Sequence, residues 1–569
     1  MFSLTCSSCI TMDIDSNSTN FVGAVASALN LASDTADTLH SHRWALVVAA
    51  ALSLAYLTFK ARRPKGWNPP PNIPERIPFV SNGWAFVRDP RGFLDHVSTS
   101  MRKMGAGVAT VYLGPVPVTI IKGAERVRTA MFRERGGLSP DRFLMMVMGN
   151  VEGMTSADLR KYVEDGSGRG RKPREGWEGF PEGKRVWARQ RAVVHDVLGR
   201  RAETDGLARR FQGYFREGLG GEVGRWEEVL LGDVLRREMA DAAGKAMVGT
   251  GVFETVPDLV ERFWRFDAVA LRLILGVPWW WDPGAYRARE GLLRVLEGYL
   301  VDVLERVTLD EAGRLDGGED PDWEPMLGSR YNRAVAAFGL SAGLSTRALA
   351  GGMAMALFGL NSNSIPITVW ALFELARDGE LLAAVREEVA PAIGEDGVFD
   401  VDALESMPLL KAVYLETMRM HVAIGITREA AENVKIDGYD VPKGRMVQAP
   451  TSFGGEDAGV WGDDVGVWKP GRHLRDDGKG GREFVDLAKE GEFFPYGGGA
   501  TVCAGRHFAK QEIMLAVAVV VSRFDIEFVE WTELDGRRSE REAREDPRYV
   551  GAAAVPPDRD MRIRWRRQW

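Results

Sequence analysis

A glycine-rich loop with one cysteine, followed by an apolar helical run, is the feature that most constrains this chain. The loop covers residues 494–506, Cys503 lies near its end, and the apolar run covers residues 508–521. The other two cysteines among the 569 residues, Cys6 and Cys9, lie near the N-terminus. A thiol at a helix N-terminus faces backbone N–H donors and the positive end of the helix dipole, which lower its pKa. The pattern therefore predicts an activated thiolate at Cys503.

A thiolate in such a loop is suited to be an axial ligand of haem iron. It would push electron density onto the metal and favour O–O cleavage. Gly499 and Gly505 would let the backbone approach a flat macrocycle and adopt φ values that other residues avoid. The alternative interpretation is a buried free cysteine beside a glycine turn, which is what a lone cysteine usually is. Motifs elsewhere in the chain decide between the two.

Three further motifs precede the loop in the chain. Trp187 and Arg191 are four residues apart, Glu416 and Arg419 are three apart, and Arg472 follows within a Lys-Pro-Gly-Arg-His segment. Residues three apart share a helix face, so Glu416 and Arg419 can present a carboxylate and a guanidinium together. A second guanidinium could complete a charge-assisted network. Taken singly, these motifs have ordinary explanations, namely an exposed ion pair and a helix with one core indole.

With these motifs in order, the sequence resembles the cytochrome P450 family over roughly residues 70 to 569. The family's loop runs Phe-x-x-Gly-x-Arg-x-Cys-x-Gly, and Tyr496, Gly499, Cys503 and Gly505 fall at the corresponding places. Tyr496 replaces the phenylalanine, and Thr501 replaces the basic residue that usually holds a haem propionate. The resemblance implies a mainly α fold with small β-sheets, and haem b with Cys503 as the axial iron ligand.

The resemblance also implies roles for the residues upstream of the loop. Trp187 and Arg191 would meet one haem propionate, and Arg428 would meet the second. Because Thr501 is not basic, the two arginines would carry more of that anchoring. A structural network that pins the cysteine loop would comprise Glu416, Arg419 and Arg472.

An apolar segment at residues 351–376 is interrupted by polar residues and a proline. Pro366 has no backbone N–H to donate and should kink a helix just upstream. At such a kink the family commonly has an acid–alcohol pair that orients water and delivers protons. Ser362 and Asn363 align there, so the carboxylate is missing and an amide replaces the hydroxyl, while Ser364 could still supply a hydroxyl. The alternative is that short polar residues satisfy freed backbone groups.

These departures resemble the branch of cholesterol 7α-hydroxylase and prostacyclin synthase, and the cysteine loop looks most like filamentous-fungal members. The implied function is a monooxygenase of secondary metabolism that hydroxylates or epoxidises a hydrophobic terpenoid, sterol, polyketide or alkaloid. Its partners would be O2 and NADPH–cytochrome P450 reductase. A haem-thiolate isomerase or dehydratase, acting on a peroxide without O2 or NADPH, is the alternative. A non-enzymatic haem- or lipid-binding protein is the third.

An uncharged apolar run at residues 44–59 precedes a basic cluster. As a helix it would reach ~24 Å, closer to a thin endoplasmic-reticulum bilayer than to a ~30 Å hydrocarbon core. The cations that follow it place the catalytic domain in the cytosol. We therefore expect a single-pass anchor in the endoplasmic-reticulum membrane. A signal peptide and a buried helix of the globular domain are the alternatives.

The rest of the chain completes a four-part organisation. We expect a disordered lumenal segment at 1–43, the anchor at 44–59, a basic, proline-rich hinge at 60–75 and the catalytic domain at 76–569. Asn17 is a weak glycosylation acceptor if it is lumenal. A hydrophobic content of 45% suits one large core, and a net charge of −7 with dispersed basic residues argues against nucleic-acid binding.

Three shorter segments carry predictions of their own. The charged, glycine-rich stretch 165–184 is interpreted as an inserted surface loop, and 434–447 as a hairpin. The loop at 278–283 contains three consecutive tryptophans, which cannot all face one core. Either it dips into lipid, or two of its indoles pack in the core and one is exposed.

Overall fold

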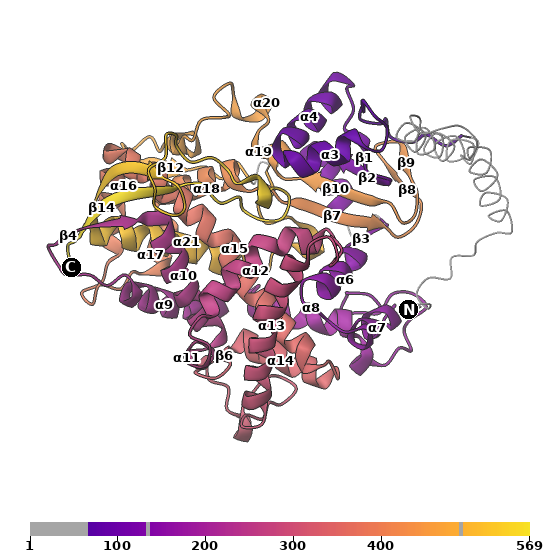
Figure 1. The fold of residues 1–569 in the computed structure, drawn as a ribbon, viewed down its shortest axis with the longest axis horizontal. Helices are drawn as coiled ribbons and strands as arrows, with labels where there is room; N and C mark the ends of the chain where they lie inside the picture. Colours follow the sequence, from indigo (N-terminus) through magenta and orange to yellow (C-terminus); the bar gives the residue numbers. More distant parts are fainter. Residues whose placement is uncertain (1–65, 133–136, 489–492) are drawn as a thin grey trace, which may run out of the picture. The chain divides into compact units, whose positions relative to one another are not determined.

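Helices make up most of the chain that the structure describes (Figure 1). The structure is a computed structural model, and it describes residues 66–132, 137–488 and 493–569. The chain divides into two units, Met1–Trp67 and Asn68–Trp569, and the second is described here by itself. The predicted segments 1–43 and 44–59, with Asn17, lie outside the described residues. The predicted mainly helical fold with small sheets is confirmed.

The longer helices carry most of the buried residues. They are α3 (Ser81–Arg88), α4 (Pro90–Lys103), α5 (Ala124–Val127), α6 (Asp141–Asn150), α7 (Ser156–Glu164), α8 (Val186–Val197), α9 (Arg201–Gly218), α10 (Leu231–Val248), α11 (Gly251–Thr255), α12 (Leu259–Ile274), α13 (Pro283–Leu304), α14 (Arg330–Ser341), α15 (Thr346–Arg377), α16 (Gly379–Val389), α17 (Val401–Ser406), α18 (Pro408–His421), α19 (Ser452–Gly455), α20 (Ala458–Trp461) and α21 (Arg506–Arg523). The short turns of π or 3₁₀ helix are η1 (Arg128–Phe132), η2 (Glu182–Lys184), η3 (Asp316–Gly318), η4 (Ala390–Ala392), η5 (Pro470–His473), η6 (Gly499–Thr501) and η7 (Pro547–Tyr549).

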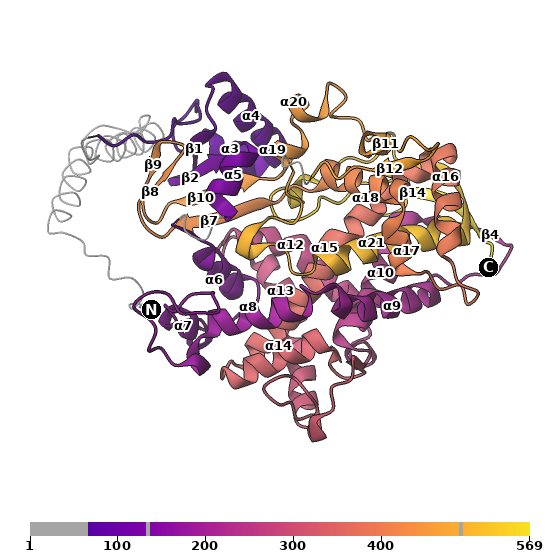
Figure 2. The same cartoon turned by 180° about the vertical axis from the view of Figure 1, so that it is seen from behind.

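The strands form small sheets beside the helices. They are β1 (Val108–Leu113), β2 (Val116–Ile121), β3 (Leu138–Ser139), β4 (Trp226–Leu230), β5 (Trp323–Glu324), β6 (Gly328–Ser329), β7 (Gly425–Ala430), β8 (Val434–Ile436), β9 (Tyr439–Val441), β10 (Met446–Pro450), β11 (Leu474–Asp476), β12 (Arg482–Phe484), β13 (Phe524–Thr532) and β14 (Asp560–Arg567). The largest described sheet has the order β1-β2-β10-β7-β3, and a second has the order β13-β14-β4. Figure 2 shows α3 and α4 beside β1 and β2, where Phe93 and Val97 of α4 pack on Val111 and Ile120.

Helix α15 forms the centre of the helical region. Ser345 caps its first turn, because the Ser345 side chain accepts a hydrogen bond of 3.2 Å from the Ala348 N–H. The helix packs on α10, α13, α18 and α21. It is long and apolar enough to cross a membrane, but 78% of its most apolar window is buried inside the protein. It is therefore a core helix, and it continues through Pro366.

Helix α21 follows the cysteine loop directly and is buried along most of its length. Its residues 513–521 are buried on every face, because α9, α15, α16 and α18 surround it. A helix that is apolar all round is typical of a protein interior. The prediction of an apolar helix beginning just after Cys503 is confirmed.

A hairpin lies within the predicted range 434–447, but it is shorter than predicted and covers 434–441. Strands β8 and β9 pair in antiparallel register, with Val434 opposite Val441. The turn lies at Asp437 and Gly438, which have φ angles of 50° and 81°. Positive φ at both central residues gives the turn that matches the twist of the flanking strands. Strand β10 then joins the large sheet between β2 and β7.

The segment 165–184 differs from a simple surface loop. Ser167 is fully buried, and Arg185, which follows the segment, is 1% exposed. The Arg185 guanidinium donates to Ser167 Oγ at 3.1 Å and to the carbonyl oxygen of Arg171 at 2.9 Å. At the start of the segment, Asp165 accepts the N–H of Trp187 at 3.0 Å. These bonds hold the segment against α8, so its charged composition reflects internal pairing as well as solvent contact.

The three tryptophans between α12 and α13 are all exposed. Trp279, Trp280 and Trp281 expose 66%, 65% and 74% of their surface. The alternative in which two of them pack in the core is therefore wrong. Exposing three indoles costs the burial that would otherwise stabilise the protein, so this apolar surface suggests a contact outside the described chain.

Candidate functional site

Cys503 lies on the wall of an internal cavity of about 470 Å³. Helices α15 and α21, the end of α18, strand β7 and residues 494–505 surround the cavity. The lining is mostly apolar and includes Leu144, Met355, Leu360, Ile367, Ile426 and Phe508. The cysteine loop and the central helix, far apart in sequence, thus face the same space.

The backbone holds the Cys503 thiol at the start of α21. The N–H of Cys503 donates to the carbonyl oxygen of Tyr496 at 3.0 Å, and Arg506 donates to the carbonyl oxygen of Cys503 at 3.1 Å. Protein atoms surround the Cys503 side chain, and its exposed surface faces the cavity. Burial raises the pKa of the thiol, while N–H groups of Gly505 and Arg506 and the Arg506 charge lower it. The predicted lowering by the helix terminus is thus present but smaller than the effect of burial.

Two glycines before Cys503 permit close packing. Gly499 has a φ of 64°, and a Cβ there would lie 2.4 Å from the carbonyl oxygen of Phe132. A Cβ at Gly498 would lie 2.5 Å from the Phe132 ring. Gly505 differs from the sequence-based expectation, because its φ of −77° is open to any residue. Among described atoms, the nearest to a Cβ at Gly505 is Cys503 Sγ at 4.0 Å, so the glycine keeps the surroundings of the sulfur open.

Glu416 is the centre of a fully buried polar network. Arg419 donates two hydrogen bonds of 2.9 Å to its carboxylate, and Arg472 donates one of 2.8 Å. His473 and the N–H of Lys469 contact the same carboxylate at 3.1 and 2.9 Å. Burial would raise the pKa of Glu416, but hydrogen bonds from Arg419, His473 and Arg472 outweigh it and lower the pKa to about 2. The structure thus brings together the three residues that the sequence grouped.

Arg191 and Arg428 present cationic groups that the protein itself does not neutralise. The Nε atom of Arg191 is buried without a hydrogen-bond partner. Arg428 donates to the carbonyl oxygen of Thr427 at 2.8 Å and contacts Thr501 Oγ1. In the described part of the chain, neither arginine has a carboxylate within salt-bridge distance. A buried guanidinium nitrogen without an acceptor, such as Arg191 Nε, needs an acceptor from outside the chain.

Trp187 has a hydrogen-bond partner within the protein. Its indole N–H donates to the carbonyl oxygen of Tyr162 at 3.0 Å, so it is not available to a propionate. The ring is 3% exposed and packs edge-on against Tyr162. The guanidinium of Arg169 covers its face, with Cζ 4.2 Å from the ring centroid. Sequence reasoning missed Arg169, because nothing in a charged loop indicates which cation folds inward.

The three polar residues of α15 point to different surroundings. Ser362 Oγ contacts the carboxylate of Asp267, on α12, and does not line the cavity. Asn363 lines the cavity, and its Oδ1 accepts the N–H of Ala554 at 3.1 Å. Ser364 also lines the cavity, and its hydroxyl has no hydrogen-bond partner among the described residues. Successive helix residues are ~100° apart, so they cannot all face one site.

Two buried carboxyl groups near α15 were not predicted. Glu512 on α21 lines the cavity, and neither of its oxygens has a hydrogen-bond partner among the described residues. Burial raises the pKa of Glu512 to about 8, against a lowering effect of the nearby Ser364 hydroxyl. Burial likewise raises the pKa of Asp267 to about 6, opposed by Ser362. The available signal was an acidic residue within an apolar helical run, as at Glu512.

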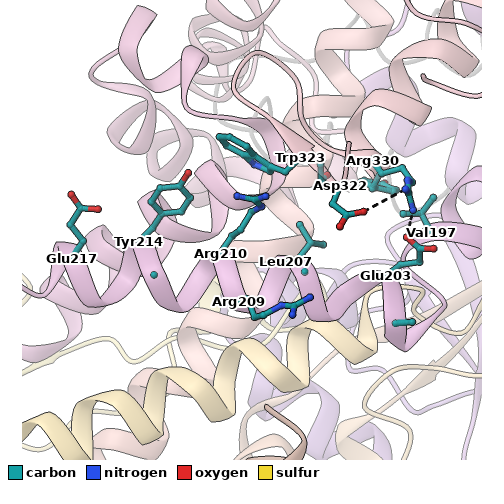
Figure 3. A pocket seen from close by; sticks show the side chains of 15 residues that line it. Val197, Glu203, Leu207, Arg209, Arg210, Tyr214, Glu217, Asp322, Trp323 and Arg330 are labelled. Carbon is teal, nitrogen blue, oxygen red and sulfur yellow. Dashed lines mark hydrogen bonds and ion pairs between the residues drawn. The ribbon is translucent and has the colours of Figure 1, made fainter. Parts of the chain in front are cut away.

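A groove of about 660 Å³ lies beside α9 and meets the cavity at Tyr331, which lines both. Figure 3 shows Arg209, Arg210 and Trp323 along it. The guanidinium of Arg210 stacks on Trp323, with Cζ 4.7 Å from the ring centroid. Arg330 pairs with Glu203 at 2.9 Å. Arg330 therefore has carboxylate partners within the protein, in contrast with Arg191.

The residues that line the cavity, with those beside it, fit a haem. The Cys503 sulfur borders the cavity, Gly498 and Gly499 allow close backbone packing, and an orphaned buried nitrogen of Arg191 lacks an acceptor. A haem carries two carboxylates, which match unneutralised guanidinium groups, and an iron that takes a thiolate ligand. The donor set and the hollow space thus suit this group.

Comparison with known proteins agrees with this geometry. The family model described as Cytochrome P450 matches residues 355–538, which include the second part of α15, the Glu416 network and the cysteine loop. The chain is 36% identical to cytochrome P450 monooxygenase calL of Penicillium decumbens over 536 residues, covering 92% of this chain and 97% of that protein. It is 25% identical to efuG of Hormonema carpetanum, over 81% of this chain and 84% of that one, and to fsoE of Humicola fuscoatra, over 88% of each.

Proposed function

This chain belongs to the cytochrome P450 family, and we propose that it hydroxylates or epoxidises a hydrophobic small molecule in fungal secondary metabolism. The position of Cys503 on the wall of an apolar cavity carries the proposal. When bound, a haem with a thiolate ligand supplies reductive activation of dioxygen, with one oxygen atom entering the substrate and the other leaving as water. Cys503 would supply the thiolate that binds the haem iron.

The cavity lining supports an apolar substrate. Side chains such as Met355, Leu360 and Ile367 offer dispersion contacts and no charge. Their role would be to orient a C–H or C=C bond and exclude bulk water. A terpenoid, sterol, polyketide or alkaloid would meet this requirement.

Polar residues of α15 and α21 would handle protons. Asn363 is held by its bond to the Ala554 N–H, which leaves its amide nitrogen as a donor at the cavity. Glu512 has a pKa of about 8 because of burial, so its carboxyl oxygen carries a proton at neutral pH. It could pass this proton to Ser364 Oγ. Ser362 would act indirectly, by fixing the helix through Asp267.

The Glu416 network and the arginines would have separate tasks. Glu416, Arg419 and Arg472 would hold the backbone that supports the cysteine loop, because their groups are satisfied by each other. Arg191, Arg428 and Thr501 would face the haem propionates, with Thr501 acting through its contact with Arg428. Gly499 and Gly505 would leave room beside the macrocycle.

Electrons would come from NADPH–cytochrome P450 reductase. Arg506 lies one turn from the cysteine ligand, and Lys510 follows on the same helix. Cations near the ligand would favour an acidic partner surface. The family implies this partner, and the placement of these side chains supports it.

Membrane attachment is part of the proposal. Exposed Trp279, Trp280 and Trp281 suit the interfacial region of a bilayer, where indoles are enriched. On α3, Trp84 and Val87 expose 66% and 75% of their surface. Together with the predicted anchor at 44–59, these residues support a single-pass protein of the endoplasmic-reticulum membrane with its catalytic domain in the cytosol.

The isomerase or dehydratase alternative is not favoured. It was motivated by the missing carboxylate beside Asn363, but Glu512 provides a buried carboxyl at the same cavity. The curated relatives over most of the chain are monooxygenases by name. The absence of an acidic residue from the helix kink therefore does not exclude oxygen insertion.

Isotopically labelled dioxygen tests the proposal. The native host would be grown under labelled dioxygen with the wild-type protein, with Cys503→Ala, or with the surface control Glu483→Gln. We expect a product heavier than its precursor by one labelled oxygen in the wild type and control, and accumulation of the precursor in the cysteine variant. A product that is isomeric with its precursor, or differs from it by water, would overturn oxygen insertion.

A further inference from the structure

Arg169 projects from segment 165–184 and is held in place by two contacts. Its Nε donates to Asp141 Oδ1 at 2.8 Å, and its guanidinium stacks on Trp187. Its side chain is 20% exposed. The two terminal nitrogens make no hydrogen bond with any described residue. A stacked guanidinium held through Nε keeps its outer edge free for a carboxylate.

Arg169 belongs to a group of three guanidinium groups. Burial and the charge of Arg169 together lower the pKa of Arg428 to about 10, against the opposing effect of Asp141. Burial also lowers the pKa of Arg169, partly countered by Asp141, and the charge of Arg191 adds to the lowering. The three cations therefore repel one another across a region where Asp141 is the carboxylate that offsets them. Binding of an additional anion would stabilise this cluster of three guanidinium groups.

Two positions expected to bind a propionate do not provide the donor. The Trp187 N–H is used by the carbonyl oxygen of Tyr162, and Thr501 has no positive charge. Arg169 covers the face of that same indole, and its partner Asp141 follows Pro140, which lines the cavity together with Arg428. A guanidinium is thus held at the end of the cavity where Trp187 and Thr501 provide no charge.

We propose that Arg169 binds a haem propionate, together with Arg191 and Arg428. Three guanidinium groups and the carboxylate of Asp141 leave two positive charges, which two propionates neutralise. Trp187 is then a positioning residue that supports Arg169 from below, and Asp141 sets the direction of its guanidinium. Segment 165–184 thus supplies the positive charge that Thr501 lacks.

Haem transfer tests this assignment. Holoenzyme carrying Arg169→Ala would be mixed with excess apomyoglobin, and haem loss followed by the change in Soret absorbance. A charge-assisted hydrogen bond contributes about 1.5 kcal/mol or more, so we expect haem to leave roughly ten times faster than from the wild type. Arg174→Ala is the matched control, because Arg174 lies in the same segment and approaches Asp141 at 3.7 Å, but is 58% exposed. It should transfer haem at the wild-type rate.

Two more measurements separate binding from a structural role. Resonance Raman spectra should show a shifted propionate bending mode in Arg169→Ala and in the milder Arg169→Gln. Trp187→Phe keeps a ring beneath Arg169 and removes the N–H, so it should leave that mode in place. An unchanged propionate mode in both Arg169 variants, or equal haem loss from the Arg169 and Arg174 variants, would overturn the assignment.

Discussion

The Glu416 network and the Arg169 cluster are both built from arginines, but they differ in how their charges are satisfied. In the first, one carboxylate receives hydrogen bonds from Arg419, Arg472, His473 and a backbone N–H. In the second, Arg191 Nε lacks a partner and three cations share one nearby carboxylate. A buried polar group that makes all its hydrogen bonds within the protein stabilises the fold. A buried polar group that lacks a partner within the protein marks a site where a ligand binds.

The largest effect is expected from breaking the complete network. Glu416→Gln would leave buried Arg419 without its anion and would leave Arg472 only Asp464, and removing one partner of a buried pair costs ~3–5 kcal/mol. We expect the variant to accumulate little haem-loaded protein and to unfold at a lower urea concentration. The control Asp402→Asn removes a carboxylate that is 79% exposed and should cost below ~1 kcal/mol. A Glu416 variant as stable as this control would contradict the structural role.

The second effect concerns pH and contrasts the buried carboxyl group of Glu512 with that of Glu416. Burial raises the pKa of Glu512 from 4.5 to about 8. Between these values the folded state binds more protons than the unfolded state, so stability falls as pH rises through this window. Urea unfolding of wild type and Glu512→Gln across that range measures it. In the variant, the free energy of unfolding should fall less steeply with pH than in the wild type. If the two plots of unfolding free energy against pH run parallel, the pKa of Glu512 is not raised.

The third effect tests the incomplete cluster directly. Arg191→Ala should raise the rate of haem transfer to apomyoglobin about tenfold, because a charge-assisted bond to the propionate is lost. Removing a buried cation without a partner should not destabilise the apoprotein. Parallel measurements of haem transfer and of apoprotein unfolding would show this. If Arg191→Ala destabilises the apoprotein as much as Glu416→Gln does, Arg191 stabilises the fold instead of binding the haem.

The smallest effect distinguishes neighbouring serines. Ser362→Ala removes the hydroxyl that satisfies buried Asp267, so we expect a loss of about 1–3 kcal/mol in the free energy of unfolding. Ser364→Ala removes a hydroxyl without a partner and should change stability by less than ~0.5 kcal/mol. Its effect should appear instead as NADPH consumed without product. Equal losses of stability would show that Ser364 also has a structural partner.

The sequence predicted groups whose partners lie close along the chain. Glu416 and Arg419 share a helix face three residues apart, and the glycines near Cys503 adjoin the start of α21. Local periodicity and spacing are sufficient for such predictions. A hairpin around Gly438 was predicted for the same reason.

Other contacts could not be predicted, because their members are far apart in sequence. Ser362 and Asp267 lie on helices that only the packing of α12 on α15 brings together. Trp187 has two possible uses for its N–H, and the approach of Tyr162 decides between them. The inward turn of segment 165–184 likewise depends on hydrogen bonds from Arg185 to backbone carbonyl oxygens, and no sequence pattern indicates which carbonyl groups accept them.

The sequence by itself determined the family, the cysteine that would carry the haem and the carboxylate that organises its support. Those features require particular residue types at particular spacings, and a spacing can be read directly. Only the tertiary structure decided that Arg169 covers Trp187, that Glu512 lines the same cavity as Ser364 and that Ser362 turns away from this cavity. These depend on which of several equivalent polar groups is buried beside which other, and burial is a property of the packed chain.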